Sequence, residues 1–83
     1  MKEEDFYNII GQNIKKYRNE YNKKYGKMTQ ELLAEKLNTS VSFISKLESK
    51  RTYQSISIPT LYKISIILKI PIDKLIEGDT KWI

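Results

Sequence analysis

The chain has 83 residues, enough for one domain, and contains neither cysteine nor histidine. Without those residues there is no disulfide, no thiolate or imidazole metal ligand, no cysteine nucleophile and no histidine base, so an enzyme is not expected. Fifteen Lys and Arg against ten Asp and Glu give a formal net charge of +5, which suits a polyanionic partner such as nucleic acid or anionic lipid.

Composition also bears on where the protein works. No apolar run reaches the ~20 residues that a membrane span requires. Residues 1–5 are charged, where a signal peptide would be apolar, so a cytoplasmic protein is expected. Lysine outnumbers arginine thirteen to two. That bias is typical of AT-rich genomes and indicates a low-GC bacterium, a phage or another mobile element.

The first predicted element is an amphipathic helix. Apolar residues recur at intervals of four, four, three and four, the spacing of one helix face: Phe6, Ile10, Ile14, Tyr17 and Tyr21. The polar segment 22–27, which contains a glycine, is expected to be a loop. Thr29 then offers a hydroxyl that can cap a second helix, whose inner face carries Leu33, Ala34 and Leu37.

The third and fourth helices are predicted from their first residues and inner faces. Ser40 is a good N-cap for the third helix, which has Ile44 and Leu47 on its inner side. Residues 50–57 lack a helical period and are expected to be a loop. Pro59 fits the first turn of the fourth helix, whose inner stripe is Leu61, Ile64, Ser65 and Leu68.

The last predicted helix is short. It begins at Pro71, runs to Ile76 and is expected to end at Gly78 in the left-handed conformation, which glycine adopts without steric cost. Residues 1–78 are thus predicted to form one all-α domain of five helices. Residues 79–83 are predicted to be a tail without assignable structure.

The second and third helices, with the tight turn between them, form the most informative feature (residues 29–49). Two such helices can cross steeply only where the facing side chain is small, and Ala34 meets that need. The turn requires a residue that tolerates positive φ, as Asn38 does. With Ile44 and Leu47 facing inward, the other face of the third helix is free to point outward: Val41, Ser42, Phe43, Ser45 and Lys46.

Four motifs follow one another from about Ile9 to Glu77. They are Ile10-Gly11-Gln12-Asn13-Ile14 with Arg18, then Met28 to Leu37 (MTQELLAEKL), Ile44-Ser45-Lys46-Leu47-Glu48, and Ile70 to Ile76 (IPIDKLI). The combination resembles the helix-turn-helix domains of phage repressors, Cro proteins and the xenobiotic-response-element regulators. The resemblance implies a compact five-helix, lambda-repressor-like domain that binds double-stranded DNA.

The resemblance also implies roles for particular residues. The third helix, Ser40 to Ser49, would read bases in the major groove, and Gln30 would hydrogen-bond a phosphate at the start of the second helix. Arg18 and Glu48 match a structural ion pair of the family. The loop after the third helix would lie along the DNA backbone and confer salt dependence. The predicted DNA-binding residues are Gln30, Ser40, Val41, Ser42, Phe43, Ser45, Lys46, Lys50, Arg51, Thr52, Tyr53 and Gln54.

Two positions depart from the family's pattern. The family often has glycine where this chain has Lys50, so the exit from the third helix is expected either to differ or to strain that residue. Val41 replaces a polar base reader and could contact a thymine methyl group instead. Phe43 could make the same contact or pack against the turn. Gln30 and the loop cations also have an ordinary alternative, as solvated side chains.

The predicted function is a transcriptional regulator, a repressor that acts as a homodimer on a palindromic operator, since one reading helix covers too few base pairs. The alternative is an antitoxin-like or developmental-regulator module whose main role is to bind a partner protein. No cofactor and no metal site are expected. Apolar residues that so small a core cannot all bury are candidates for the dimer interface: Ile56, Ile58, Ile70, Ile72, Trp82 and Ile83.

Overall fold

One long helix and four short ones make up the part of the chain that the structure describes. The computed structural model describes residues 2–78. Its helices are α1 (Glu3–Lys24), α2 (Gln30–Lys36), α3 (Val41–Glu48), α4 (Ile58–Leu68) and α5 (Ile72–Ile76). The predicted all-α fold with five helices is confirmed. The predicted tail, residues 79–83, lies outside the described residues, and with it Trp82 and Ile83 of the candidate dimer interface.

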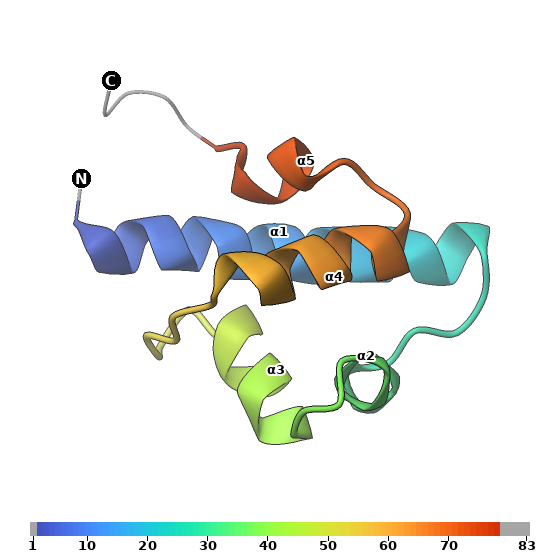
Figure 1. Ribbon diagram of the computed structural model, residues 1–83. Coiled ribbons are helices and arrows are strands. Elements are labelled where there is room, and N and C mark those ends of the chain that lie inside the picture. The colour runs from blue at the N-terminus through green and yellow to red at the C-terminus, as the bar shows by residue number, and fades with distance from the viewer. Residues whose placement is uncertain (1, 79–83) are drawn as a thin grey trace.

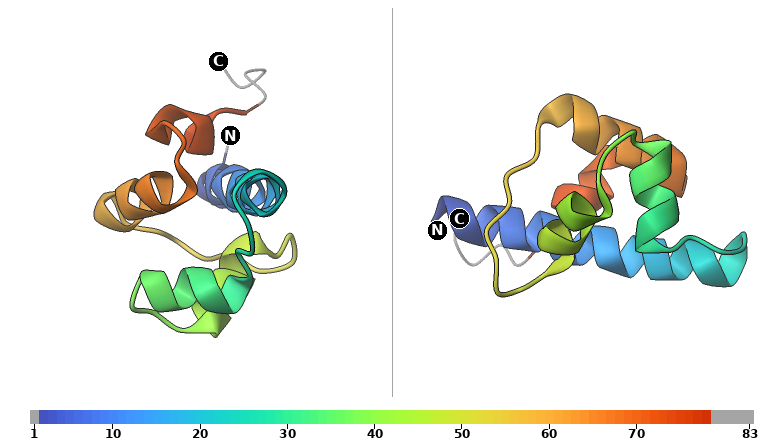
Figure 2. Two further views of the ribbon diagram at one scale, coloured as in Figure 1. Left: turned by 90° about the vertical axis from the view of Figure 1, so that its right-hand side faces the viewer. Right: turned by 90° about the horizontal axis from the view of Figure 1, so that it is seen from below.

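The four short helices are arranged around α1, which runs the length of the molecule (Figure 1). α4 lies alongside α1, α5 lies above it, and α2 and α3 form a layer below it (Figures 1 and 2). α1 packs against α3, α4 and α5, and α2 packs against α3. The long helix therefore joins the α2–α3 pair to the rest of the domain.

The core consists of the inner helix faces that the sequence predicts. Most of the predicted inward residues are buried, namely Ile10, Ile14, Leu33, Ala34, Ile44, Leu47, Leu61, Ile64, Ser65 and Leu68. Met28 and Leu75 join them. Tyr17, Tyr21 and Leu37 are only partly buried, and the prediction of Phe6 as an inward residue is wrong, because its side chain is 36% exposed near the start of α1. Ile56 is only 8% exposed, so its prediction as a dimer-interface residue is wrong: it is removed from water within the core. Ile70 and Ile72 pack partly buried against the same core, which leaves Ile58 exposed among the described candidates.

The helix ends follow the predicted capping chemistry. The hydroxyls of Thr29 and Ser40 accept hydrogen bonds from the backbone N–H groups of Leu32 and Phe43, each three residues on. In the turn after α2, Asn38 has the predicted positive φ, 56°. The next N–H, of Thr39, donates to the carbonyl of Ala34 at 2.9 Å and closes a Schellman motif.

Two predicted boundaries are wrong. α1 continues to Lys24, beyond the expected loop start at residue 22, because the Asn22 side chain bonds both the helix and the next segment. Its amide donates to the carbonyl of Arg18, and its oxygen accepts from the N–H of Met28 at 2.6 Å. At the other end, α5 stops at Glu77 in an extended conformation, and Gly26 is the glycine with positive φ among residues 2–78.

The left-handed ending expected at Gly78 is replaced by a side-chain cap. The Asn13 amide of α1 donates to the carbonyl of Leu75 at 2.9 Å and to that of Glu77 at 2.6 Å. The last carbonyl groups of a helix lack hydrogen-bond donors inside the helix. The Asn13 amide donates to them here, where a left-handed glycine would otherwise let backbone N–H groups do so. The same two bonds attach α5 to α1.

Candidate nucleic-acid interface

The α2–α3 pair forms the layer below α1, and its two short helices lie at an angle to each other (Figure 2). Ala34 of α2 is 3% exposed and belongs to the same core cluster as Ile44 and Leu47 of α3. A small side chain at this position lets the helices pack closely. The Schellman turn at Asn38 then sets the direction in which α3 leaves α2.

One buried carboxylate ties the C-terminal end of α3 to α1 and α2. Glu48 is 4% exposed and receives two hydrogen bonds from Arg18 of α1, Nε to Oε2 at 2.8 Å and Nη2 to Oε1 at 2.9 Å. Gln30 of α2 donates its amide to Oε1 at 2.9 Å. Gln12 of α1 donates to the Glu48 backbone carbonyl at 3.0 Å. Three helices therefore meet at this residue.

The pairing favours the charged form of the arginine. Hydrogen bonding to Glu48 raises the pKa of Arg18 above its ordinary value, against the desolvation that burial imposes. The third nitrogen of the guanidinium, Nη1, donates to the carbonyl of Met28 at 3.0 Å. The structure thus contains the ion pair that the family resemblance implied. Such a buried pair is costly to break, so it fixes the orientation of α3 more than it adds net stability.

A second anchor of α3 is a backbone contact that the sequence analysis missed. Gly11 of α1 is buried, and a Cβ at this position would overlap the carbonyl oxygen of Leu47 in α3. Only glycine permits this approach of the two helix backbones. A signal was present, because a glycine in the middle of an amphipathic helix costs stability unless packing requires it.

The outer face of α3 is exposed, as the sequence predicts. Val41 is 42% exposed, and Ser42, Ser45 and Lys46 are exposed as well. Phe43 is half-buried and packs against the core, whereas the packing alternative considered for it named the turn. Four predicted contact residues therefore share an accessible surface on one short, capped helix.

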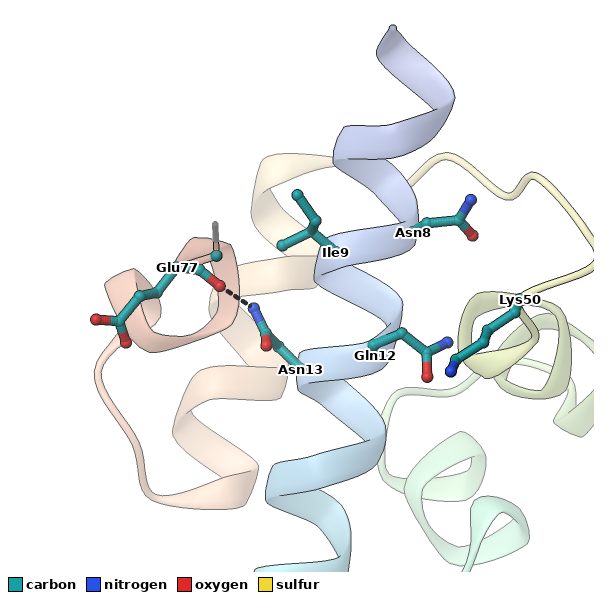
Figure 3. Close-up of a pocket in the computed structure, with 7 residues that line it drawn as sticks. Asn8, Ile9, Gln12, Asn13, Lys50 and Glu77 are labelled. Atoms are coloured by element: carbon teal, nitrogen blue, oxygen red, sulfur yellow. Dashed lines mark hydrogen bonds between the residues drawn. The ribbon is translucent and has the colours of Figure 1, made fainter. Parts of the chain in front are cut away.

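Two predicted phosphate ligands point elsewhere in the structure. The Gln30 amide is directed at Glu48, as described above, and its side chain is half-buried. The Lys50 side chain runs back toward Gln12 of α1 (Figure 3). It borders a surface hollow of about 450 Å³ that Asn8, Ile9 and Glu77 also line. Lys50 does not have a positive φ, and the chain leaves α3 extended at Ser49, so the exit differs from the glycine pattern without backbone strain.

The loop after α3 holds its own shape through the polar residues predicted to touch DNA. The Thr52 hydroxyl donates to the carbonyl of Lys46 at 2.9 Å, and the Gln54 amide donates to that of Ser55 at 3.1 Å. The Tyr53 ring meets the Tyr7 ring edge-on at 5.5 Å. Arg51 is exposed, and its backbone N–H donates to the Ser49 hydroxyl at 3.1 Å. The loop is therefore a braced segment that carries an exposed cation.

A capped, anchored helix with an open outer face, following a second helix across a tight turn, defines a helix-turn-helix DNA-binding domain. The chain matches the helix-turn-helix family over residues 14–75 and belongs to it. It is a DNA-binding transcription regulator of the xenobiotic-response-element type, and this family is a regulatory family, not an enzyme family. A search of curated proteins found no match. Within residues 2–78, no helix is both long and apolar enough to cross a bilayer.

Proposed function

We propose that this protein is a repressor that binds a palindromic operator as a homodimer, with α3 in the major groove. The observation that carries the proposal is the contrast along α3. Its C-terminal end is fixed by Glu48 and Gly11, whereas Val41, Ser42, Ser45 and Lys46 are exposed. A helix held in this way can enter the groove without rearrangement of the domain.

The chemistry of the exposed face suits base readout. The ammonium group of Lys46 can donate to the O6 and N7 acceptors of guanine, and the hydroxyls of Ser42 and Ser45 can donate or accept. Val41 offers an apolar contact for a thymine methyl group. We assign direct readout to these four residues. Phe43 supports them from its half-buried position against the core.

Phosphate contacts are assigned to the residues around that face. Gln30 uses one amide N–H for Glu48 and retains a second for a phosphate. Arg51 is exposed in the braced loop, and Lys50 reaches a phosphate only if its side chain swings away from α1. Such contacts set affinity and salt dependence but not sequence preference.

Two copies are required because one α3 reads only a few base pairs. In a dimer with twofold symmetry, the two reading helices would lie ~34 Å apart, one turn of DNA, on a palindromic site. A dimer seated on an operator excludes other proteins from it. Repression therefore requires only binding to DNA, whereas activation would require a further contact with another protein.

Selection of binding sites from a random duplex pool tests the proposal. We expect a palindrome with half-sites one helical turn apart. On the selected site, Lys46→Ala and Ser42→Ala should weaken binding more than they do on random duplex, whereas Arg51→Ala should weaken both alike. Lys74→Ala is the matched control, because α5 lies on the far side of α1 from α2 and α3 (Figure 1). Equal losses on both duplexes for Lys46→Ala and Ser42→Ala would contradict base readout by α3.

Salt dependence separates this function from a module that binds only a protein partner. A dimer with about 6–10 phosphate contacts should lose roughly 10³–10⁵ in affinity for duplex DNA between 50 and 200 mM salt. A domain that works only through a protein partner would bind duplex weakly at both concentrations.

A further inference from the structure

Helix α4 exposes an apolar stripe that the functions described above do not use. Ile58, Tyr62 and Ile66 are 70%, 56% and 59% exposed. They are spaced four residues apart and so lie along one side of the helix. We call these three residues the α4 stripe. On another side of α4, Leu61, Ile64 and Leu68 are buried in the core.

An α4 that is apolar on two sides is unusual for a helix at the surface. Its one charged residue is Lys63, which follows Tyr62 and therefore lies about 100° around the helix, off the stripe. A helix that is apolar nearly all round is normally covered on both sides. The α4 stripe is therefore a surface that a partner would cover.

We propose that the α4 stripe is the contact between two copies of this chain; this rests on the homodimer of the proposed function. The argument is the symmetry of the stripe: a tyrosine lies in the middle, with an isoleucine four residues before it and another four residues after it. Two α4 helices that pack antiparallel about a twofold axis through Tyr62 place Ile58 of each copy against Ile66 of the other. A twofold contact must be self-complementary in this way, whereas a different partner imposes no such symmetry.

The area of the stripe can be compared with the area that a stable dimer buries. An aromatic side chain has about 150–250 Å² of surface, so Tyr62 leaves on the order of 100 Å² uncovered. With the two isoleucines, the stripe presents roughly 300–400 Å², within the range of the largest apolar patch on a typical monomer, which is often functional. A stable dimer buries about 800 Å² per partner. The stripe covers less than half of that area, so we expect the free protein to dimerise weakly and binding to two half-sites to reinforce the dimer.

The position of α4 leaves the reading helices free in such a dimer. α4 lies beside α1, and α2 and α3 form the separate layer below (Figures 1 and 2). A twofold axis that runs from the α5 side of the molecule to the α2–α3 side reverses the direction of α4. It also keeps both α3 helices on the same side of the dimer. This is the disposition that a palindromic site requires.

Cysteine cross-linking tests the register, because the chain has no native cysteine. Disulfides form only where Cα atoms approach within about 7 Å. On mild oxidation without DNA, Tyr62→Cys should give roughly fivefold more cross-linked dimer than Asn19→Cys, an exposed control in α1. A mixture of Ile58→Cys and Ile66→Cys should cross-link more than either variant alone. Cross-linking of Tyr62→Cys at the control level would overturn the proposal.

Sedimentation and DNA binding separate this inference from the proposed function. Tyr62→Asp should raise the dimer Kd by at least about tenfold and leave the helical circular dichroism unchanged, since the side chain is exposed. A wild-type chain that is monomeric at high micromolar concentration, free and on DNA, would overturn the α4 contact. A wild-type dimer that Tyr62→Asp does not weaken would overturn it too. Stripe-dependent dimers that bind no duplex would instead support the contact and refute DNA readout.

Discussion

The two ends of α3 differ in burial and in their contacts with the rest of the domain. At the C-terminal end, Glu48 is 4% exposed and receives side-chain bonds from two other helices, and Gly11 brings the α1 backbone against Leu47. At the N-terminal end, Val41 and Ser42 are exposed, and the hydroxyl of Ser40 provides the side-chain cap. Substitutions at the C-terminal end would disturb contacts with other helices. Side chains at the N-terminal end can be replaced without disturbing the fold.

With the proposed function, we expect stability and DNA recognition to reside in different residues of this one eight-residue helix. Substitutions at the C-terminal end should change the free energy of unfolding. Substitutions on the outer face should change DNA binding while the fold persists. The predictions below test this division, beginning with the largest expected effect on stability.

Gly11→Ala should have the largest effect. Alanine favours an isolated helix by about 1 kcal/mol over glycine. Here its Cβ would overlap the carbonyl oxygen of Leu47, so α1 and α3 would have to separate. We expect the free energy of unfolding to fall by about 3 kcal/mol or more, a large part of the about 5–15 kcal/mol typical of a domain. Urea denaturation followed by circular dichroism measures this change.

The matched control for that experiment is Asn19→Ala, at an exposed position of the same helix. It should change stability by no more than about 0.5 kcal/mol. If Gly11→Ala left stability unchanged or raised it, as a glycine-to-alanine change does in an isolated helix, the close approach of α1 and α3 would not exist.

Glu48→Gln should have the next largest effect, because it leaves the guanidinium of Arg18 half-buried without its carboxylate. We expect a loss of about 2–3 kcal/mol in the free energy of unfolding. The double variant Arg18→Met, Glu48→Leu should be more stable than Glu48→Gln, since no unpaired charge remains. A double-mutant cycle of Arg18→Met, Glu48→Leu and their combination, measured by urea denaturation, provides the coupling energy. Additive losses would argue against the ion pair.

Ser40→Ala tests the cap at the open end and should cost about 1 kcal/mol, because the N–H of Phe43 loses its side-chain acceptor. Thermal unfolding measures the loss. Ser40→Thr, which retains the hydroxyl, should recover most of it. A loss as large as that of Glu48→Gln would mean that the N-terminal end is anchored after all.

Ser42→Ala should have the smallest effect on stability, within about 0.5 kcal/mol, because the side chain is exposed and alanine is the better helix former. The same variant is expected to bind the operator less tightly. Unfolding and DNA-binding measurements on one preparation test both statements. A substantial loss of stability would contradict the separation of the two roles.

Local patterns predicted the helices well. The apolar spacing of α1, the hydroxyl caps of Thr29 and Ser40, and the left-handed Asn38 all depend on neighbours within a few residues. The same holds for the outward face of α3, which follows from the burial of Ile44 and Leu47. A second left-handed residue, Lys69 at φ 60°, was not predicted, because lysine seldom adopts that conformation.

The parts that could not be predicted depend on partners far along the chain. The Gln30 amide meets Glu48 across 18 positions, and Asn13 caps α5 across more than 60. The sequence motif identifies a polar side chain but does not predict which of several hydrogen-bond acceptors that side chain will contact. The direction of the Lys50 side chain is a similar case, since it depends on how the loop after α3 packs beside α1.

The interior position of Glu48 has a consequence for the kinetics of association. When a disordered segment folds on binding, ordering its chain costs about 2–5 kcal/mol of the interaction energy. In the proposed function, α3 is complete before any encounter with DNA, so no ordering step precedes docking. The association rate constant is then set by orientation and by electrostatic attraction between a cationic domain and phosphates, and it falls steeply as ionic strength rises.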